Sequence, residues 1–313
     1  MSASKPDLLV LHVLSDAHLL QLADLFTVHY APTSQQRATA IAEHGALFRA
    51  VLTVGALGLT AAEMDAMPQL TWIGSLGAGY ENIDIAHAKL RGIVVSNGAG
   101  TNDSCVADHA FGLIIAAVRG LVRLDKLTRQ GVWRNDIPLP PNVSGKRLGI
   151  LGLGTIGEKI ARRAQAFDMP VGYHNRKPKE GAGYAYFDSV QALAEWADVL
   201  MVATPGGAAT KHLVNRQVLD ALGPQGYVVN IARGSVVDTA ALALALREGR
   251  LAGAGLDVYE SEPLPPAVLL DSDKVVLTPH VAGWSPEAVQ ATVDLFVLNG
   301  QRHFAGQPLV TPV

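Results

Sequence analysis

The feature that most limits the possible folds of this chain is a regular alternation of short apolar segments with helix-like segments. In the N-terminal third, the apolar segments have the length and β-branched content of buried strands. The expected strands there are 8–14, 48–55, 70–76 and 92–97, and the expected helices are 33–45, 60–67 and 83–92. Strands that alternate with helices in this way form parallel sheets with helices on both faces. We therefore expect an α/β protein.

A second series of the same kind predicts a second domain. Its expected strands are 146–151, 169–174, 197–204, 226–232, 253–258 and 274–279, and its expected helices are 156–167, 189–196, 216–222 and 238–249. A mostly apolar helical stretch, 102–127, separates the two series, and a last helix, 286–303, follows the second one. We expect this last helix to complete the first domain, so that the second domain is inserted into it.

Composition excludes several classes of protein. Of 313 residues, 49% are hydrophobic, which is enough apolar material for two cores. With a net charge of −3, the chain has no net-positive balance to attract nucleic acid or an anionic membrane, and no apolar run approaches the roughly 18 residues that span a bilayer. The single cysteine, Cys105, and ten histidines without ligand spacing argue against a metal site. We expect a cytoplasmic protein without metal, nucleic-acid or membrane partners.

The segment 152–157, Gly-Leu-Gly-Thr-Ile-Gly, fits the dinucleotide-binding pattern G-x-G-x-x-G between a strand and a helix. Gly152 permits a tight turn, Gly154 lets the backbone approach a pyrophosphate, and Gly157 lets helix and strand pack closely. Thr155 and Ile156 complete the expected cofactor contacts here, where the turn meets a helix whose free N–H groups attract phosphates. A glycine turn in a domain that binds no nucleotide is the alternative.

The residues after the next strand indicate which dinucleotide binds. An NAD site usually has Asp or Glu there, to bind the ribose 2′-hydroxyl. This chain has His174, Asn175, Arg176 and Lys177 instead, so two cations stand where an acid is expected. Because Arg176 can pair with a 2′-phosphate through two hydrogen bonds, we predict NADPH, with NADH as a weaker alternative. A basic turn that only faces solvent is the other interpretation.

Three later strands end in polar residues: Arg233 in 230–234, Glu262 in 256–263 and His280 in 278–283. In an open parallel sheet, residues at the carboxyl ends of strands line the ligand crevice. Taken singly, Arg233 could form a surface salt bridge, Glu262 could be a solvated acid, and His280 could be a satisfied polar residue at a strand end. Together with the glycine turn, the three favour one site.

In this order and spacing, GLGTIG, NIARGSVVD, LDVYESEP and TPHVAG resemble the D-2-hydroxyacid dehydrogenase family. The similarity extends to 75–79, 102–109 and 144–150, and it covers most of 70–300. Within the family, the basic turn resembles NADPH-dependent glyoxylate/hydroxypyruvate reductases. Asp108 replaces the usual glutamate, a mild departure, and Glu262 stands where formate dehydrogenases carry glutamine.

The resemblance implies two Rossmann-like parallel-sheet domains. A flavodoxin-like substrate-binding domain would comprise 1–99 and 287–313, and a dinucleotide-binding Rossmann domain, 100–286, would be inserted into it. Arg233 would bind the substrate's carboxylate and ketone oxygens, and His280 would protonate the ketone oxygen. Glu262 would orient the imidazole of His280 and favour its charged form.

Further contacts follow from the resemblance alone. The N–H groups of Leu76, Gly77 and Ala78 would bind the substrate carboxylate. Asp257 would hold the nicotinamide carboxamide, although it could instead cap a loop. The remaining expected cofactor contacts are Thr204, Pro205, Ile231 and Ala232.

The predicted function is therefore NADPH-dependent reduction of a small 2-oxoacid, glyoxylate or hydroxypyruvate. The alternatives are a reductase of bulkier 2-ketoacids such as hydroxyphenylpyruvate, and a non-catalytic nicotinamide-sensing partner protein. The stretch 110–118 is apolar on nearly every face, which predicts a homodimer.

Overall fold

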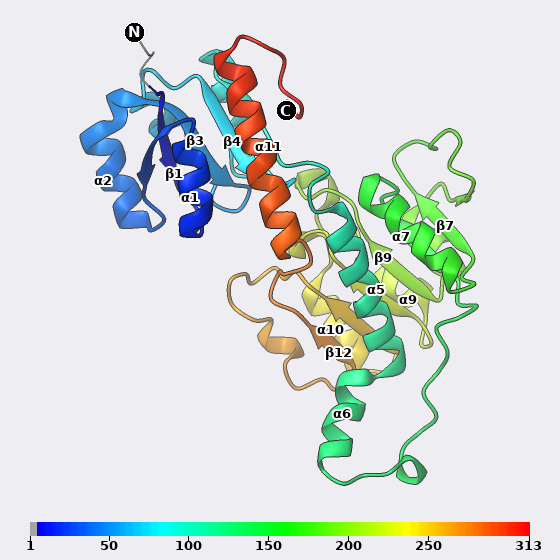
Figure 1. Ribbon diagram of the computed structural model, residues 1–313. Helices are drawn as coiled ribbons and strands as arrows, with labels where there is room; N and C mark the ends of the chain where they lie inside the picture. Colours follow the sequence, from blue (N-terminus) through cyan, green and yellow to red (C-terminus); the bar gives the residue numbers. More distant parts are fainter. Residues whose placement is uncertain (1–4) are drawn as a thin grey trace. The chain divides into compact units, whose positions relative to one another are not determined.

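The computed structural model describes residues 5–313 and divides the chain into two compact α/β units (Figure 1). The first unit comprises Met1–Asn102 and Trp284–Val313, and the second unit is Asp103–Gly283. The boundaries predicted from the sequence lie after residue 99 and after residue 286. Each unit is built on one parallel sheet, so the expected α/β class with two parallel-sheet domains is confirmed.

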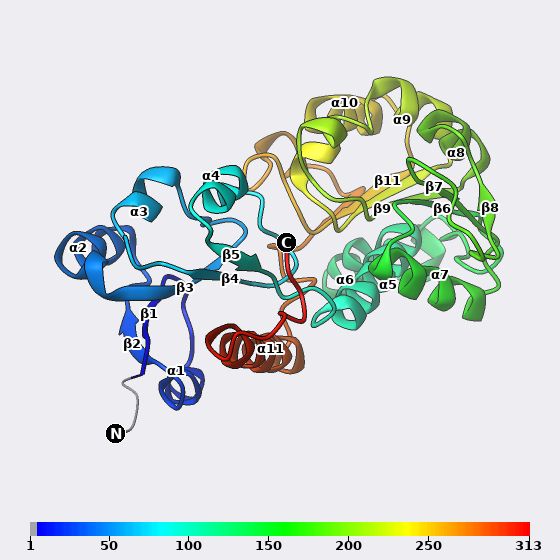
Figure 2. The same cartoon turned by 90° about the horizontal axis from the view of Figure 1, so that it is seen from above.

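The first unit has a five-stranded parallel sheet in the order β2-β1-β3-β4-β5. Its strands are β1 (Asp7–Val10), β2 (Thr27–Tyr30), β3 (Phe48–Val54), β4 (Trp72–Leu76) and β5 (Val94–Ser96). Its helices are α1 (Asp16–Ala23), α2 (Ser34–His44), α3 (Ala61–Asp65), α4 (Ile85–Leu90) and α11 (Pro286–Phe304). Helices α2, α3 and α4 cover one face and α1 and α11 the other, each over its own apolar core (Figure 2). This strand order is that of flavodoxin-like sheets.

The second unit has a seven-stranded parallel sheet in the order β12-β11-β10-β9-β6-β7-β8. Its strands are β6 (Leu148–Leu151), β7 (Val171–His174), β8 (Ala185–Tyr186), β9 (Val199–Val202), β10 (Tyr227–Asn230), β11 (Gly253–Leu256) and β12 (Val275–Leu277). Its helices are α5 (Asp103–Arg119), α6 (Leu121–Arg129), α7 (Thr155–Ala166), α8 (Val190–Trp196), α9 (Arg216–Leu222) and α10 (Thr239–Arg247). Helices α5 and α7 cover one face and α8, α9 and α10 the other (Figure 2).

Strand order in the second unit reverses between β6 and β9, which are neighbours although α7, β7, β8 and α8 separate them in sequence. Ligands of open α/β sheets bind outside the carboxyl ends of the strands at such a switch point. The glycine turn follows β6 and Thr204 follows β9, so both segments lie at this point.

The structure contains elements that the sequence did not predict, and one predicted helix is divided into two. Helix α1 and the short strands β2 and β8 were not expected. The predicted helix 102–127 is two helices, α5 and α6, because Gly120 between them adopts a left-handed φ of 63°. Among the described residues no single helix is long and apolar enough to cross a membrane, although α5 and α6, bent by 59°, satisfy that test as a pair by length and composition alone.

Candidate active site

The glycine turn of the second unit has the geometry that a phosphate-binding turn requires. Gly152 has a φ of +103°, and a Cβ built on it would lie 2.8 Å from the backbone of Ala203 and Thr204. A Cβ on Gly157 would overlap the carbonyl oxygen of Gly152. By contrast, nothing lies within 4 Å of a Cβ built on Gly154. Gly152 and Gly157 therefore allow the backbone segments around the turn to pack closely. Gly154 leaves open space in front of the turn, where a ligand could approach the backbone.

The N-terminus of helix α7 carries no side-chain cap, since Gly154 is its N-cap residue. Helices α8, α9 and α10 are capped by Ser189, Asn215 and Asp238. The N–H groups of the first turn of α7, which begins at Thr155 and Ile156, thus stay available for an anion. These features fit a bound pyrophosphate.

The basic turn after β7 lies against the glycine turn. The Asn175 side chain points inward, because its Oδ1 accepts a hydrogen bond from the Leu153 N–H at 2.7 Å. His174 bonds through Nδ1 to the Phe187 carbonyl oxygen at 2.9 Å. Arg176 and Lys177 are exposed, and neither has an acidic partner within residues 5–313. The two cations are therefore available to bind an anion beside the glycine turn.

A buried asparagine shapes the loop that carries Arg233. Asn230, 1% exposed, donates from Nδ2 to the Arg233 carbonyl oxygen at 3.0 Å and accepts from the Ala232 N–H at 3.0 Å. Ile231 and Ala232, which belong to this loop, are buried. The guanidinium of Arg233 donates from Nη1 to the Ala232 carbonyl oxygen at 2.7 Å.

Two glycines make room around Arg233. A Cβ on Gly206 would lie 2.6 Å from the Arg233 side chain, so the glycine leaves space for its aliphatic stem. A Cβ on Gly234 would overlap the backbone of Tyr259 and Glu260, so this glycine lets the loop that carries Glu262 pass close by. Thr204 is half-buried and Pro205 exposed in the neighbouring loop after β9.

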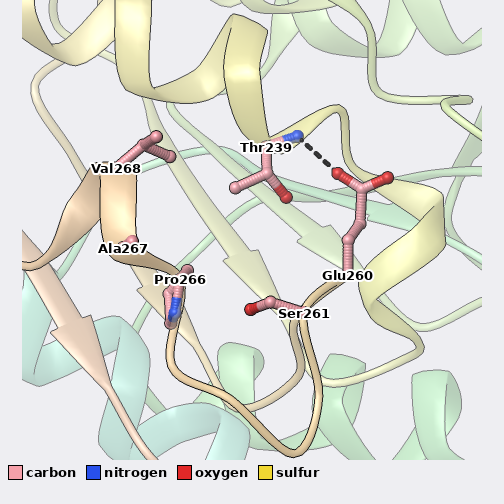
Figure 3. A pocket seen from close by; sticks show the side chains of 6 residues that line it. All are labelled: Thr239, Glu260, Ser261, Pro266, Ala267 and Val268. Atoms are coloured by element: carbon pink, nitrogen blue, oxygen red, sulfur yellow. Dashed lines mark hydrogen bonds between the residues drawn. The ribbon is translucent and has the colours of Figure 1, made fainter.

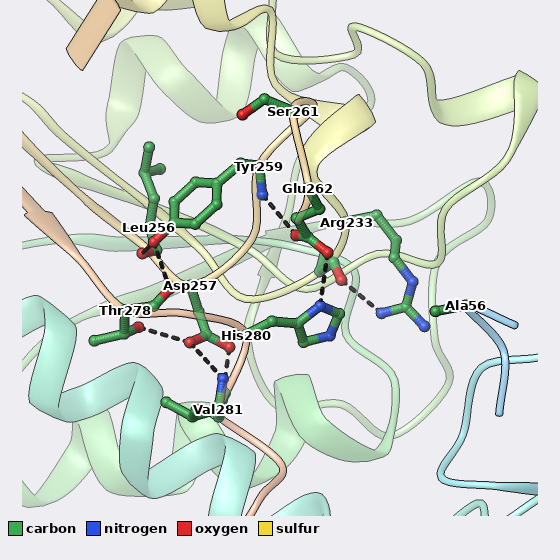
Figure 4. A network of polar contacts seen from close by, with 12 residues as sticks. Ala56, Arg233, Leu256, Asp257, Tyr259, Ser261, Glu262, Thr278, His280 and Val281 are labelled. Carbon is green, nitrogen blue, oxygen red and sulfur yellow. Dashed lines mark hydrogen bonds and ion pairs between the residues drawn. The ribbon is translucent and has the colours of Figure 1, made fainter. Parts of the chain in front are cut away.

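Glu262 and His280 form a hydrogen-bonded pair (Figure 4). His280 Nδ1 lies 2.9 Å from Glu262 Oε2, and Glu262 Oε1 accepts the Tyr259 N–H at 2.8 Å. Because the carboxylate binds Nδ1–H, the other ring nitrogen, Nε2, is left to exchange a proton with a ligand. The structure thus brings together two residues that the sequence analysis proposed from separate strand ends.

Electrostatics favour the charged form of both partners. The hydrogen bond from His280 to Glu262 raises the pKa of the imidazole, against burial and the nearby Arg233 charge, which lower it. Burial alone would raise the pKa of Glu262, but hydrogen bonds from His280 and the Tyr259 N–H, and the charges of His280 and Arg233, lower it overall. The pair is therefore suited to hold a proton on the imidazole and release it to a bound oxygen.

Asp257 lies at the carboxyl end of β11 and is 1% exposed. Its Oδ1 accepts from the Thr278 hydroxyl at 2.6 Å and the Val281 N–H at 3.0 Å, and its Oδ2 accepts from the Ala282 N–H at 2.9 Å. The side chain therefore caps the loop that carries His280, which is the alternative role named above. A contact with the nicotinamide stays a prediction.

The expected substrate-carboxylate loop belongs to the first unit. Leu76 is the last residue of β4, Gly77 has a left-handed φ of 78°, and the Ala78 carbonyl oxygen accepts from Asn97 Nδ2 at 2.8 Å. Within the described chain, no acceptor takes the N–H groups of Gly77 and Ala78. Their role towards a substrate stays a prediction.

A hollow of about 320 Å³ beside the Glu262 loop contains none of the predicted site residues (Figure 3). It is lined by Thr239, Glu260, Ser261, Pro266, Ala267 and Val268. Both oxygens of Glu260 are occupied, one by His212 Nε2 at 2.6 Å and one by the Thr239 N–H at 3.0 Å. Glu260, the only charged residue that lines the hollow, thus has both carboxylate oxygens in hydrogen bonds to other residues of the second unit. Nor do three potential metal-ligating side chains cluster anywhere in residues 5–313.

Two residues that hold the site together, His109 and Tyr259, were not predicted from the sequence. His109 on α5 lies 2.9 Å from Thr278 Oγ1 and 3.5 Å from Asp257 Oδ1 through its Nε2. Tyr259 hydrogen-bonds to the Thr278 carbonyl oxygen. Their place within the matching motifs was the available signal, but only the folded loops show what they contact.

Known proteins resemble this chain along most of its length. Residues 111–282, within the second unit, match the model of the D-isomer specific 2-hydroxyacid dehydrogenase, NAD binding domain. The chain is 44% identical over 266 residues to hydroxyphenylpyruvate reductase of Plectranthus scutellarioides, covering 85% of each chain. It is 42% identical over 282 residues to glyoxylate/hydroxypyruvate reductase A of Arabidopsis thaliana, covering 90% of each.

A solved structure is similar over almost the whole chain. It is that of an NADPH-dependent glyoxylate/hydroxypyruvate reductase from Sinorhizobium meliloti in complex with NADP and malonate, with a TM-score of 0.91 and 38% identity. The match covers 99% of this chain and 97% of that one. The resemblance drawn from the motifs is thereby confirmed: the chain belongs to the D-isomer specific 2-hydroxyacid dehydrogenase family and is an oxidoreductase with a nicotinamide-cofactor-binding domain.

Proposed function

We propose that this enzyme reduces small 2-oxoacids, above all glyoxylate and hydroxypyruvate, to 2-hydroxyacids with NADPH. The observation that carries the proposal is the Glu262–His280 pair beside Arg233, in the unit that also carries the glycine turn and the two exposed basic residues Arg176 and Lys177. The Sinorhizobium meliloti and Arabidopsis thaliana relatives support the substrate class, and the former supports the cofactor.

Each site residue has a task in this reaction. Arg233 binds the carboxylate and ketone oxygens of the substrate through its fork of N–H donors. His280 gives the proton on Nε2 to the ketone oxygen, and Glu262 keeps the imidazole charged and correctly turned. The nicotinamide, when bound, supplies the hydride that completes the reduction. The N–H groups of Leu76, Gly77 and Ala78 bind the carboxylate from the first unit.

The proposed cofactor contacts come from the glycine turn and from the basic turn after β7. Gly152, Gly154, Thr155, Ile156 and Gly157 hold the pyrophosphate, and Arg176 and Lys177 bind the 2′-phosphate. Asn175 keeps the two turns together. We include a cytoplasmic location in the proposal, as the composition suggests.

We also propose a homodimer, but the structure changes the argument for it. Most apolar side chains of α5, including Ala110, Phe111 and Ile114, are buried within their own unit. Exposed apolar side chains lie instead on α6 and the loop that follows it, at Val122 and Trp133. We therefore expect α6 to lie in the contact between the two subunits. Light scattering tests whether the dimer forms.

A panel of substrates tests the proposed function. Because backbone groups and Arg233 bind the part common to all 2-oxoacids, selectivity comes from the side-chain pocket, where each misfit methylene is worth about 1–3 kcal/mol. With NADPH, we expect the highest kcat/KM for glyoxylate and hydroxypyruvate and weaker turnover of pyruvate, measured by the loss of reduced-nicotinamide absorbance. NADPH binding without turnover of any 2-oxoacid would favour the sensing role instead.

A second candidate is reduction of bulkier 2-ketoacids. The 44% identity to a hydroxyphenylpyruvate reductase favours it. Higher kcat/KM for hydroxyphenylpyruvate than for glyoxylate and hydroxypyruvate would replace the first candidate by this one.

Replacing Glu262 with glutamine should change the pH dependence of the reaction. Glu262 raises the pKa of His280, so its loss lowers that pKa. Reduction requires the protonated imidazole and falls as pH rises through this pKa, so its alkaline limb should move to lower pH. Oxidation of the 2-hydroxyacid requires the neutral imidazole, so its acidic limb should move the same way. We expect kcat/KM to fall roughly 10- to 10³-fold, within the worth of a positioned acid. Unchanged profiles in both directions would contradict the pairing.

A further inference from the structure

Tyr259 contacts Glu262 and also the loop that carries His280 (Figure 4). Its backbone N–H donates to Glu262 Oε1 at 2.8 Å. Its phenol hydroxyl donates to the carbonyl oxygen of Thr278, two residues before His280, and also lies 3.4 Å from the Leu256 carbonyl oxygen. One residue therefore links the strand end that supplies Glu262 to the loop that supplies His280.

The loop that carries His280 needs such support because its backbone is strained. His280 has a φ of +54°, in the left-handed region that residues with a Cβ rarely adopt. Its N–H donates to the Asp257 carbonyl oxygen at 2.8 Å and, at 3.1 Å, to the same Thr278 carbonyl oxygen that Tyr259 contacts. The Thr278 carbonyl oxygen thus accepts two hydrogen bonds, one from the Tyr259 hydroxyl and a longer one from the His280 N–H. Removing the phenol hydroxyl would leave only the longer one.

We propose that Tyr259 is a positioning residue of this enzyme, whose hydroxyl holds the Thr278–His280 turn so that the imidazole meets Glu262. The proposal rests on the acid role of His280 proposed above. It assigns Tyr259 no contact with the substrate or the cofactor.

Tyr259 acts as a hydrogen-bond donor and not through a charge of its own. Burial first, and then the charges of Asp257 and Glu262, raise the pKa of its hydroxyl to about 12, so it stays protonated at working pH. The charged groups that face His280 are Glu262, Arg233 and Asp257, and a Tyr259→Phe change leaves all three in place. A changed pH profile in that variant would therefore report the position of the imidazole relative to Glu262.

The test compares Tyr259→Phe with Tyr227→Phe. Tyr227, at the start of β10, is buried in the second unit, whereas Tyr259 is half-buried, and the Tyr227 hydroxyl makes no hydrogen bond within the described chain. In Tyr259→Phe we expect kcat for glyoxylate reduction to fall roughly 5- to 50-fold, because small misplacements of an acid are costly, with KM changed less than about twofold. The alkaline limb should move to lower pH, and the His280 ring signal in an NMR titration of the free enzyme should titrate at lower pH. The control should match the wild type in all of these.

The outcomes separate this inference from the function on which it rests. If His280→Ala lowers kcat by roughly 10²–10⁴ while Tyr259→Phe keeps the wild-type kcat and His280 titration, the positioning role is wrong and the proposed acid stands. If His280→Ala is fully active, the proposed acid is wrong, whatever Tyr259 does. In a Glu262→Gln background, the Tyr259→Phe change should no longer shift the pH profile, since the two act through one contact. Additive shifts would overturn the inference.

Discussion

Replacing His280 with alanine is expected to lower kcat for 2-oxoacid reduction by roughly 10²–10⁴, the usual worth of a positioned general acid. The structure gives the reason. His280 Nδ1 is committed to Glu262 at 2.9 Å, the pKa of the ring is raised by that hydrogen bond, and Nε2 remains to deliver the proton. KM and NADPH binding should change little, because Arg233 and the glycine turn are untouched. Steady-state kinetics and NADPH titration measure the two effects.

The chain supplies a matched control for this variant. His212 and Glu260 form a similar pair, with 2.6 Å between Nε2 and Oε1, and His212 also has a left-handed φ, of 50°. This pair holds the start of α10 through Thr239 and has no proposed role in the reaction. His212→Ala should therefore keep turnover near the wild-type value. Near wild-type turnover of His280→Ala would mean that another group donates the proton.

The sequence predicts most of the fold because its sheets are buried on both faces. Strands such as β9 and β10 are continuous apolar runs, which stand out between polar helical segments. The edge strand β2 was missed because its residues are half-buried or exposed and therefore lack that signal. The break at Gly120 was missed because a single glycine inside an apolar helical pattern is compatible with a continuous helix.

The candidate site also contains residues that the sequence predicts and residues whose roles it does not. Residues at strand ends, such as Glu262 and His280, could be predicted because parallel strands deliver their carboxyl ends to one edge of the sheet. The inward turn of Asn175, the capping role of Asp257 and the link made by Tyr259 depend on which way a side chain points after a turn. Loop conformation decides that, and no periodicity in the sequence encodes it.

Cofactor choice should be strongly biased. We expect kcat/KM for NADPH to exceed that for NADH by roughly 30- to 1000-fold in low salt. Arg176 can make two charge-assisted hydrogen bonds to a 2′-phosphate, each worth about 1.5–3 kcal/mol, and Lys177 adds a point charge. Both side chains are exposed, so solvent and salt reduce the net preference to about 2–4 kcal/mol. The ratio should therefore shrink as ionic strength rises. Equal kcat/KM for the two cofactors in low salt would show that the basic turn only faces solvent.

The double variant Asn175→Asp with Arg176→Ala should reverse this preference. Asn175 Oδ1 accepts the Leu153 N–H at 2.7 Å, and one oxygen of an aspartate there can keep that hydrogen bond. The other oxygen is then free to accept from the ribose 2′-hydroxyl of NADH and to repel a 2′-phosphate, while the bidentate cation is gone. Arg247→Ala, which removes an exposed cation from the last turn of α10, is the control and should leave the ratio unchanged. Kinetics with both cofactors at two ionic strengths decide the matter: a double variant that still prefers NADPH in low salt would place the 2′-phosphate away from this turn.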